Sequence, residues 1–130
     1  YDQGGGDVDS RHNYFYPLRI RPGGRTVALS EYGGIAWPMP GHEPPGKTYG
    51  YGTAKDKADL TKRYKMLQWK TILPQLGRGL SALVYTQLTD VEDEVNGLFT
   101  YDRAALKPEA AAVRSCNAAL AAEFAKVTGK

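Results

Sequence analysis

The sequence contains 130 residues, a length that suits one domain. Its 42% hydrophobic and 24% charged residues are typical of a globular protein and exclude disorder as its class. The net charge of +3 is too small to indicate a nucleic-acid partner, and no apolar run is long enough to span a membrane. The chain opens in a glycine-rich stretch, without Met or a signal peptide, so we expect it to be the interior or the end of a longer protein.

Three segments have the pattern of β-strands. Residues 8–16 mix polar and aromatic side chains and predict a strand that runs into a loop. Residues 25–30 are β-prone and end at Glu31, after which residues 38–52 form a loop rich in Pro and Gly. Residues 81–88 are an almost continuous apolar run, which is typical of a strand buried on both faces of a parallel sheet.

Two helices are predicted in the second half of the chain. Thr53 and Asp56 have the spacing of a capping box at the start of the first helix, and Pro74 closes or kinks it. The Lys and Arg residues of this helix are interpreted as a solvated face. The second helix begins at Pro108 and ends near Gly129. Its apolar face follows a spacing of three and four residues and includes the single cysteine, which is interpreted as a core residue: Val113, Cys116, Leu120, Phe124 and Val127.

Polar side chains follow each predicted strand. A strand–helix–strand order implies a parallel sheet with a right-handed crossover, and ligands of such sheets bind at the carboxyl ends of the strands. Gly33 and Gly34 would let a substrate or another chain segment approach the second strand end closely. We therefore expect an active site where these polar residues converge: His12, Asn13, Glu31, Gln87, Asp90, Glu92 and Glu94.

Glu31 is the candidate for chemistry, since a carboxylate on a rigid strand end suits a nucleophile or a general base. A surface ion pair is the simpler alternative. Glycoside cleavage with retention needs a second carboxyl group about 5–5.5 Å away, for which Asp90, Glu92 and Glu94 are candidates. Residues 89–94 lack the calcium-loop pattern, and His12 and His42 are too isolated to indicate zinc, so no metal and no cofactor are expected.

Several motifs together resemble glycoside hydrolase family 2, which includes β-galactosidases, β-glucuronidases and β-mannosidases. The resemblance spans residues 7–107, and residues 6–14 are similar to the segment before the nucleophile strand of that family. Its other parts are residues 30–34 (SEYGG), 49–52 (YGYG), 84–97 (VYTQLTDVEDEVNG) and 100–103 (TYDR).

The resemblance implies an α/β fold in which residues 1–130 are a partial catalytic domain. They would be the C-terminal portion of a (β/α)8 TIM barrel, with its last three strands and helices. It implies a retaining β-glycosidase that hydrolyses O-glycosyl bonds, with Glu31 as the nucleophile that forms a covalent glycosyl-enzyme. Its expected partners are a β-linked carbohydrate and the rest of the barrel, with no nucleic acid and no membrane. The residues that it implies around the sugar are His12, Asn13, Tyr14, Trp37, Gln87 and Asp90, with Trp37 as a stacking face.

One departure from the family pattern limits the expected activity. The acid/base of the family is the Glu of an Asn-Glu pair, and this sequence contains no such pair. We therefore expect the chain by itself to be inactive. A noncatalytic carbohydrate-binding module that uses Trp37 and the tyrosines is the alternative, and a basic nucleic-acid binder ranks third. The sequence indicates no compartment, although a periplasmic or secreted location would suit a bacterial glycosidase.

Overall fold

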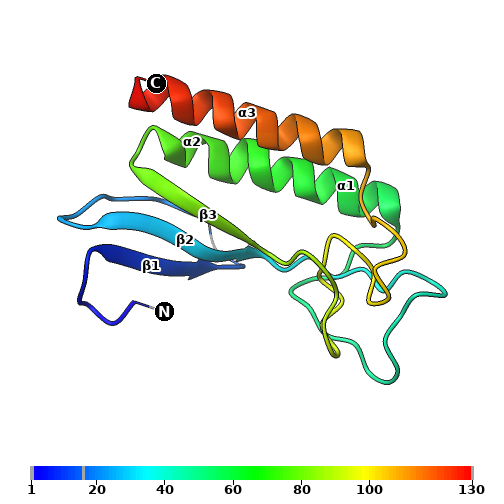
Figure 1. The fold of residues 1–130 in the computed structure, drawn as a ribbon. Coiled ribbons are helices and arrows are strands. Elements are labelled where there is room, and N and C mark those ends of the chain that lie inside the picture. Colours follow the sequence, from blue (N-terminus) through cyan, green and yellow to red (C-terminus); the bar gives the residue numbers. More distant parts are fainter. Residues whose placement is uncertain (1, 16, 130) are drawn as a thin grey trace.

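The computed structural model describes residues 2–15 and 17–129 (Figure 1). It forms a sheet with a helical layer on one face and a large loop region at one end (Figure 1). The elements in chain order are β1 (Val8–Asn13), β2 (Thr26–Gly33), α1 (Lys57–Met66), the π-helical η1 (Leu67–Ile72), α2 (Leu73–Leu76), β3 (Leu80–Thr86) and α3 (Ala110–Thr128).

The sheet is parallel throughout, as predicted, with the order β1-β2-β3. His12 of β1 lies opposite Glu31 of β2, and Gly33 of β2 lies opposite Thr86 of β3. The carboxyl ends of the three strands therefore meet at one end of the sheet, beside the loop region (Figure 1). Asp2 pairs with Arg25 just before β2, and α3 ends beside the turn between α2 and β3, so both chain ends lie at the opposite end of the sheet.

The prediction of a portion of a (β/α)8 barrel is wrong. The described residues form an open sheet of three strands, in which β1 and β3 are the two edges. A barrel closes only when the first strand of the sheet pairs with the last. Three strands with helices on one face are too few for this, so both edges of the sheet stay separate. The α1–α2 run and α3 lie side by side over the same face of this small sheet (Figure 1).

The core lies between the sheet and the helices. Val27, Leu29 and Tyr32 of β2 are buried in one cluster with apolar residues of η1, α2 and β3. The expectation that β3 is buried on both faces is wrong, because Val84 is 56% exposed. An apolar run is compatible with a buried strand or with an edge strand, and only the neighbouring elements decide between them.

The helices follow their predicted positions with local differences. The N-cap of α1 is Asp56 rather than Thr53, and its carboxylate accepts the N–H of Asp59 at 2.8 Å. The wide turns of η1 come directly before Pro74, which has no N–H to continue the regular hydrogen-bond ladder. On α3, Cys116 is buried as predicted, while Phe124 remains 39% exposed. Among residues 2–15 and 17–129, no helix is both long and apolar enough to cross a membrane.

Candidate functional site

Glu31 lies near the carboxyl end of β2, the central strand of the sheet. The hydroxyl of Tyr14 donates a hydrogen bond of 2.7 Å to its Oε2 atom. The Nδ1 atom of His12 lies 3.2 Å from the same oxygen. Because the side chain of Glu31 is 44% exposed, the carboxylate is held by two neighbours and still accessible from solvent.

Tyr14 acts on Glu31 as a neutral hydrogen-bond donor. Burial above all, together with the hydrogen bond to Glu31, raises the pKa of Tyr14 to about 12. The phenol therefore keeps its proton at neutral pH. A carboxylate that accepts this bond is fixed in orientation, which is what a nucleophile at a rigid strand end requires.

Gly33 and Gly34 leave room for aromatic rings of the chain itself. A Cβ atom on Gly33 would run into the ring of Tyr85. A Cβ atom on Gly34 would lie 2.6 Å from the ring of Tyr51 and 2.9 Å from that of Tyr14. The sequence predicts that these glycines let either a substrate or another chain segment approach closely. In the structure, it is another chain segment that approaches them.

Tyr51 is the centre of an aromatic cluster next to Glu31. Its ring stacks on Tyr14, with centroids 4.0 Å apart and an angle of 11° between the planes. Phe15 and Tyr49 meet the same ring edge-on, at 5.1 Å and 5.5 Å. Hydrogen bonding with Tyr49, burial and the nearby carboxylates of Glu94 and Glu31 all raise the pKa of Tyr51. Glu31 reaches this cluster through its hydrogen bond with Tyr14, and Glu94 reaches it through the β-bridge that it forms with Tyr49.

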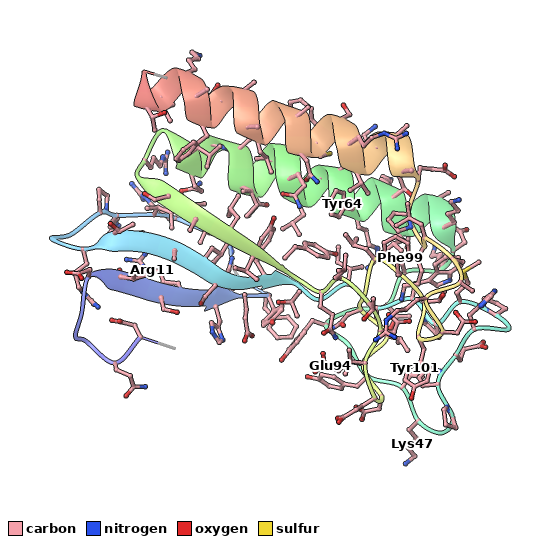
Figure 2. All side chains as sticks on the ribbon, in the orientation of Figure 1. Arg11, Lys47, Tyr64, Glu94, Phe99 and Tyr101 are labelled. Atoms are coloured by element: carbon pink, nitrogen blue, oxygen red, sulfur yellow. The ribbon has the colours of Figure 1, made fainter. Side chains whose placement is uncertain are left out.

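Gln87 belongs to a polar network in the loop after β3. Its Nε2 atom donates to Oε2 of Glu94 at 3.0 Å and to Oδ1 of Asn96 at 2.8 Å. Asn96 is fully buried and also donates to Glu94, at 3.1 Å. Figure 2 shows Glu94 in the loop region beyond the strand ends. The network fixes the direction of Glu94, one of the three candidates for a second carboxylate.

Asp90 faces the interior of the loop region. Its Oδ1 atom lies 2.7 Å from Nζ of Lys107, and the two side chains are 2% and 0% exposed. The Lys107 ammonium also donates to the carbonyl oxygens of Trp37 and Val95, each at 2.9 Å. Burial lowers the pKa of Lys107 and raises that of Asp90, and their mutual attraction opposes both shifts. The Asp90–Lys107 pair thus helps to join the loop after β2 to the loop after β3, and the buried side chain of Asp90 offers no surface to a sugar.

Trp37, like Asp90, is buried and does not have the exposed position that its predicted role as a stacking face requires. Its residue is only 9% exposed and packs with Ala54 and Leu60 in a second core cluster. A ring used in the core has no open face for a ligand, so the expected stacking face is not at Trp37. The exposed rings that contact Tyr51 are instead Phe15, at 70%, and Tyr49, at 49%, while Tyr101 elsewhere in the loop region is 45% exposed.

The structure thus brings some of the predicted residues together and separates others. His12 and Tyr14 contact Glu31, and Asn13 lies next to them at the end of β1, opposite Tyr32. The parts that the sequence reasoning missed are the rings of residues 15, 49 and 51 and the role of Asn96 as a partner of Glu94. The YGYG motif at residues 49–52 was a signal for two of these rings.

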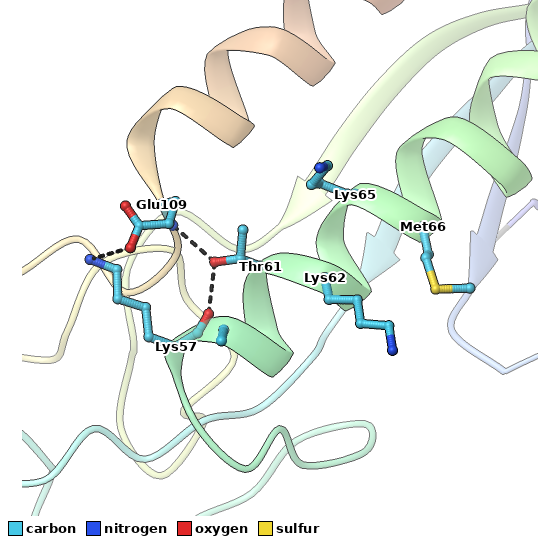
Figure 3. Close-up of a pocket in the computed structure, with 7 residues that line it drawn as sticks. Lys57, Thr61, Lys62, Lys65, Met66 and Glu109 are labelled. Atoms are coloured by element: carbon cyan, nitrogen blue, oxygen red, sulfur yellow. Dashed lines mark hydrogen bonds and ion pairs between the residues drawn. The ribbon is translucent and has the colours of Figure 1, made fainter.

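A surface hollow of about 580 Å³ lies on α1 and the start of α3, away from Glu31 (Figure 3). Lys57 pairs with Glu109 across it at 3.2 Å, while Lys62 and Lys65 are exposed. This is the solvated basic face predicted for the helix. Within the described part of the chain, no three His, Cys, Asp or Glu residues gather closely enough to hold a metal ion.

Comparison with models of known protein families finds no match to this sequence, and comparison with curated proteins finds no significant match.

Proposed function

We propose that this chain carries the nucleophile of a retaining reaction on β-linked glycosides, and that the nucleophile is Glu31. The observation that supports it is the pair of contacts on Oε2 of Glu31, from the Tyr14 hydroxyl at 2.7 Å and from His12 Nδ1 at 3.2 Å. They orient a half-exposed carboxylate at the end of the central strand.

In the proposed reaction, an oxygen of the Glu31 carboxylate attacks the anomeric carbon. A carbon–oxygen bond to Glu31 forms, and the bond to the leaving group breaks, with both of its electrons going to the leaving oxygen. Water then attacks the same carbon and gives up a proton to solvent, while the carbon–oxygen bond to Glu31 breaks, so that the sugar leaves and the carboxylate is regenerated. Because the sequence has no Asn-Glu pair to supply a proton, the first step requires a leaving group that departs as a stable anion.

The test is labelling with 2,4-dinitrophenyl 2-deoxy-2-fluoro-β-glycosides of galactose, glucose, mannose and glucuronic acid. Their leaving group needs no acid catalyst, and the fluorine slows the second step. We expect one reagent to add one fluorosugar to the peptide that contains Glu31, as measured by mass spectrometry of the digested protein. Glu31→Gln should abolish the adduct, whereas the matched control Glu43→Gln, at an exposed residue of the loop after β2, should leave it unchanged.

Two results would contradict the proposal. Labelling that persists in Glu31→Gln would place the nucleophile elsewhere. A folded wild-type chain that binds sugars but takes up none of the four reagents would favour the second candidate, a noncatalytic carbohydrate-binding module. The observation that favours that candidate is the exposure of Phe15 and Tyr49 beside Glu31.

A further inference from the structure

We propose that Phe15 and Tyr49 form a platform for a second sugar ring, so that the ligand is a β-linked oligosaccharide rather than a single sugar. The inference rests on the proposed function in one respect, because it places the first sugar ring at Glu31. The aromatic platform consists of the exposed rings of Phe15 and Tyr49 together with the ring of Tyr51 that they contact.

The exposure of the platform is the first observation. Phe15 is 70% and Tyr49 is 49% exposed, although both rings touch Tyr51. Large apolar side chains that gather at the surface beside a polar site are typical of a ligand-binding surface. Aromatic rings suit sugars, since an open ring face packs against the C–H groups of a pyranose while the hydroxyl groups bond to the polar residues around it.

The loop that carries Tyr49 and Tyr51 is also fixed by backbone hydrogen bonds. The N–H of Tyr51 donates to the carbonyl of Gly34 at 2.8 Å, and the N–H of Tyr49 donates to that of Asp93 at 2.6 Å. The Tyr49 carbonyl in turn accepts the N–H of Val95 at 2.9 Å. Because the backbone of this loop is already ordered, binding a ligand on Tyr49 and Tyr51 costs little loop entropy.

The order of the rings sets the length of the ligand. Tyr14 bonds Glu31 and stacks on Tyr51, and Phe15 and Tyr49 contact the edges of Tyr51. The exposed rings are therefore two ring contacts beyond Tyr14, since Tyr51 lies between Tyr14 and each of them. A sugar whose anomeric carbon is at Glu31 would leave them uncovered, and the next sugar ring along the chain would cover them.

The charge around the platform selects a neutral ligand. Glu31 bonds to Tyr14, whose ring stacks on Tyr51, and Glu94 lies opposite Tyr49 in a β-bridge, so two carboxylates flank the aromatic platform. Two carboxylates repel phosphate groups, so a nucleic acid whose bases stack on the same rings is disfavoured. Gln87, which holds Glu94 and is partly exposed, adds an amide group of the kind that bonds sugar hydroxyls.

The experiment compares short and long sugars on the Glu31→Gln chain, in which the proposed turnover is removed. The probes are the methyl β-glycosides of galactose, glucose and mannose and the β-1,4-linked tetrasaccharide of each, with affinity measured by NMR titration. We expect one tetrasaccharide to bind roughly tenfold or more tightly than its methyl glycoside. Phe15→Ala and Tyr49→Ala should each weaken tetrasaccharide binding roughly three- to tenfold and leave methyl glycoside binding unchanged.

The controls separate the platform from the fold and from the proposed function. Phe15→Leu keeps an apolar side chain and should still weaken tetrasaccharide binding, while Phe124→Ala, at an exposed ring on α3, should not. Equal affinity for short and long sugars, no binding of any probe, or unchanged binding by both alanine variants would overturn the platform. Tetrasaccharide binding that depends on Phe15, with no fluorosugar adduct on Glu31, would support the platform and overturn only the proposed nucleophile.

Discussion

Gly34 lies at the point where β2 gives way to the aromatic cluster, and the space left by its missing side chain is filled by two rings. Its φ angle of +64° belongs to the left-handed region that favours glycine. The backbone and the packing therefore both require glycine here. The same residue accepts the N–H of Tyr51, so that the position of the ring and the path of the backbone are coupled.

Replacing Gly34 with alanine should destabilise the protein and displace the stack. The new Cβ atom would overlap the rings of Tyr14 and Tyr51, and overpacking of this kind costs roughly 1–3 kcal/mol in the free energy of unfolding. Urea denaturation followed by circular dichroism measures the change. Gly24→Ala is the matched control: a Cβ there meets nothing within 4 Å, and the variant should be neutral or slightly more stable. Equal stability of the two variants would contradict the close approach at Gly34.

The residues that contact Glu31 could be predicted from the sequence, and the rings around them could not. His12 and Glu31 both lie near the ends of predicted parallel strands, and such ends meet at one edge of a sheet. The position of Tyr51, in contrast, depends on the carbonyl of Gly34 and on loop contacts with residues 93–95, which are more than forty positions away from it. The order of apolar, polar and Gly or Pro residues along a short segment carries no information on contacts with such distant residues.

At the scale of elements, one buried ammonium holds the loop region together. Lys107 joins the loop after β2, through the Trp37 carbonyl, to the loop after β3, through Asp90 and the Val95 carbonyl. Lys107 itself lies just before α3. A charged side chain with no exposure is stable only because each of these partners satisfies it.

Lys107→Met should cost roughly 3–5 kcal/mol of stability, because it leaves the Asp90 carboxylate buried without its partner. Thermal unfolding and urea denaturation measure the loss. Lys65→Met, at an exposed position on α1, is the matched control and should change stability little. In the double variant with Asp90→Asn, removal of the buried charge should restore part of the loss. A single variant as stable as the wild type would show that the pair does not hold the loops.

Burial of the elements was harder to predict than their positions. The strands and helices begin and end within a few residues of the predicted ranges, because apolar periodicity and Gly or Pro signals are local. The exposure of Val84 and Trp37 could not be predicted in this way. An apolar valine in β3 faces solvent and an indole expected at the surface is buried, and both outcomes depend on which elements pack nearby.

At the scale of the whole molecule, the sheet has one central strand and two edges. β2 has a hydrogen-bonded neighbour on each side, while β1 and β3 each have one. The resemblance carried by short motifs led to the prediction of a barrel, but motifs at strand ends describe a site and not the number of strands around it. The topology of the described chain is that of a small open sheet.

Amide hydrogen exchange should reveal these edges. We expect the N–H groups of β2 to exchange slowly along the whole strand, because they bond to one neighbour or the other. In β1 and β3, N–H groups that point away from β2 should exchange faster than those that point toward it. Exchange followed residue by residue with NMR makes the comparison. Uniform slow exchange along β3 would mean that its outer edge is covered.

The position of the chain ends determines how this protein can be handled in the laboratory. The segment at Asp2 and the end of α3 lie at the end of the sheet opposite the carboxyl ends of the strands (Figure 1). A fluorescent label or a surface linker attached at either end would therefore leave Glu31 and the aromatic platform facing the solution. Sugars immobilised on an array, or long polysaccharides in suspension, can reach a protein that is tethered in this way without meeting its support.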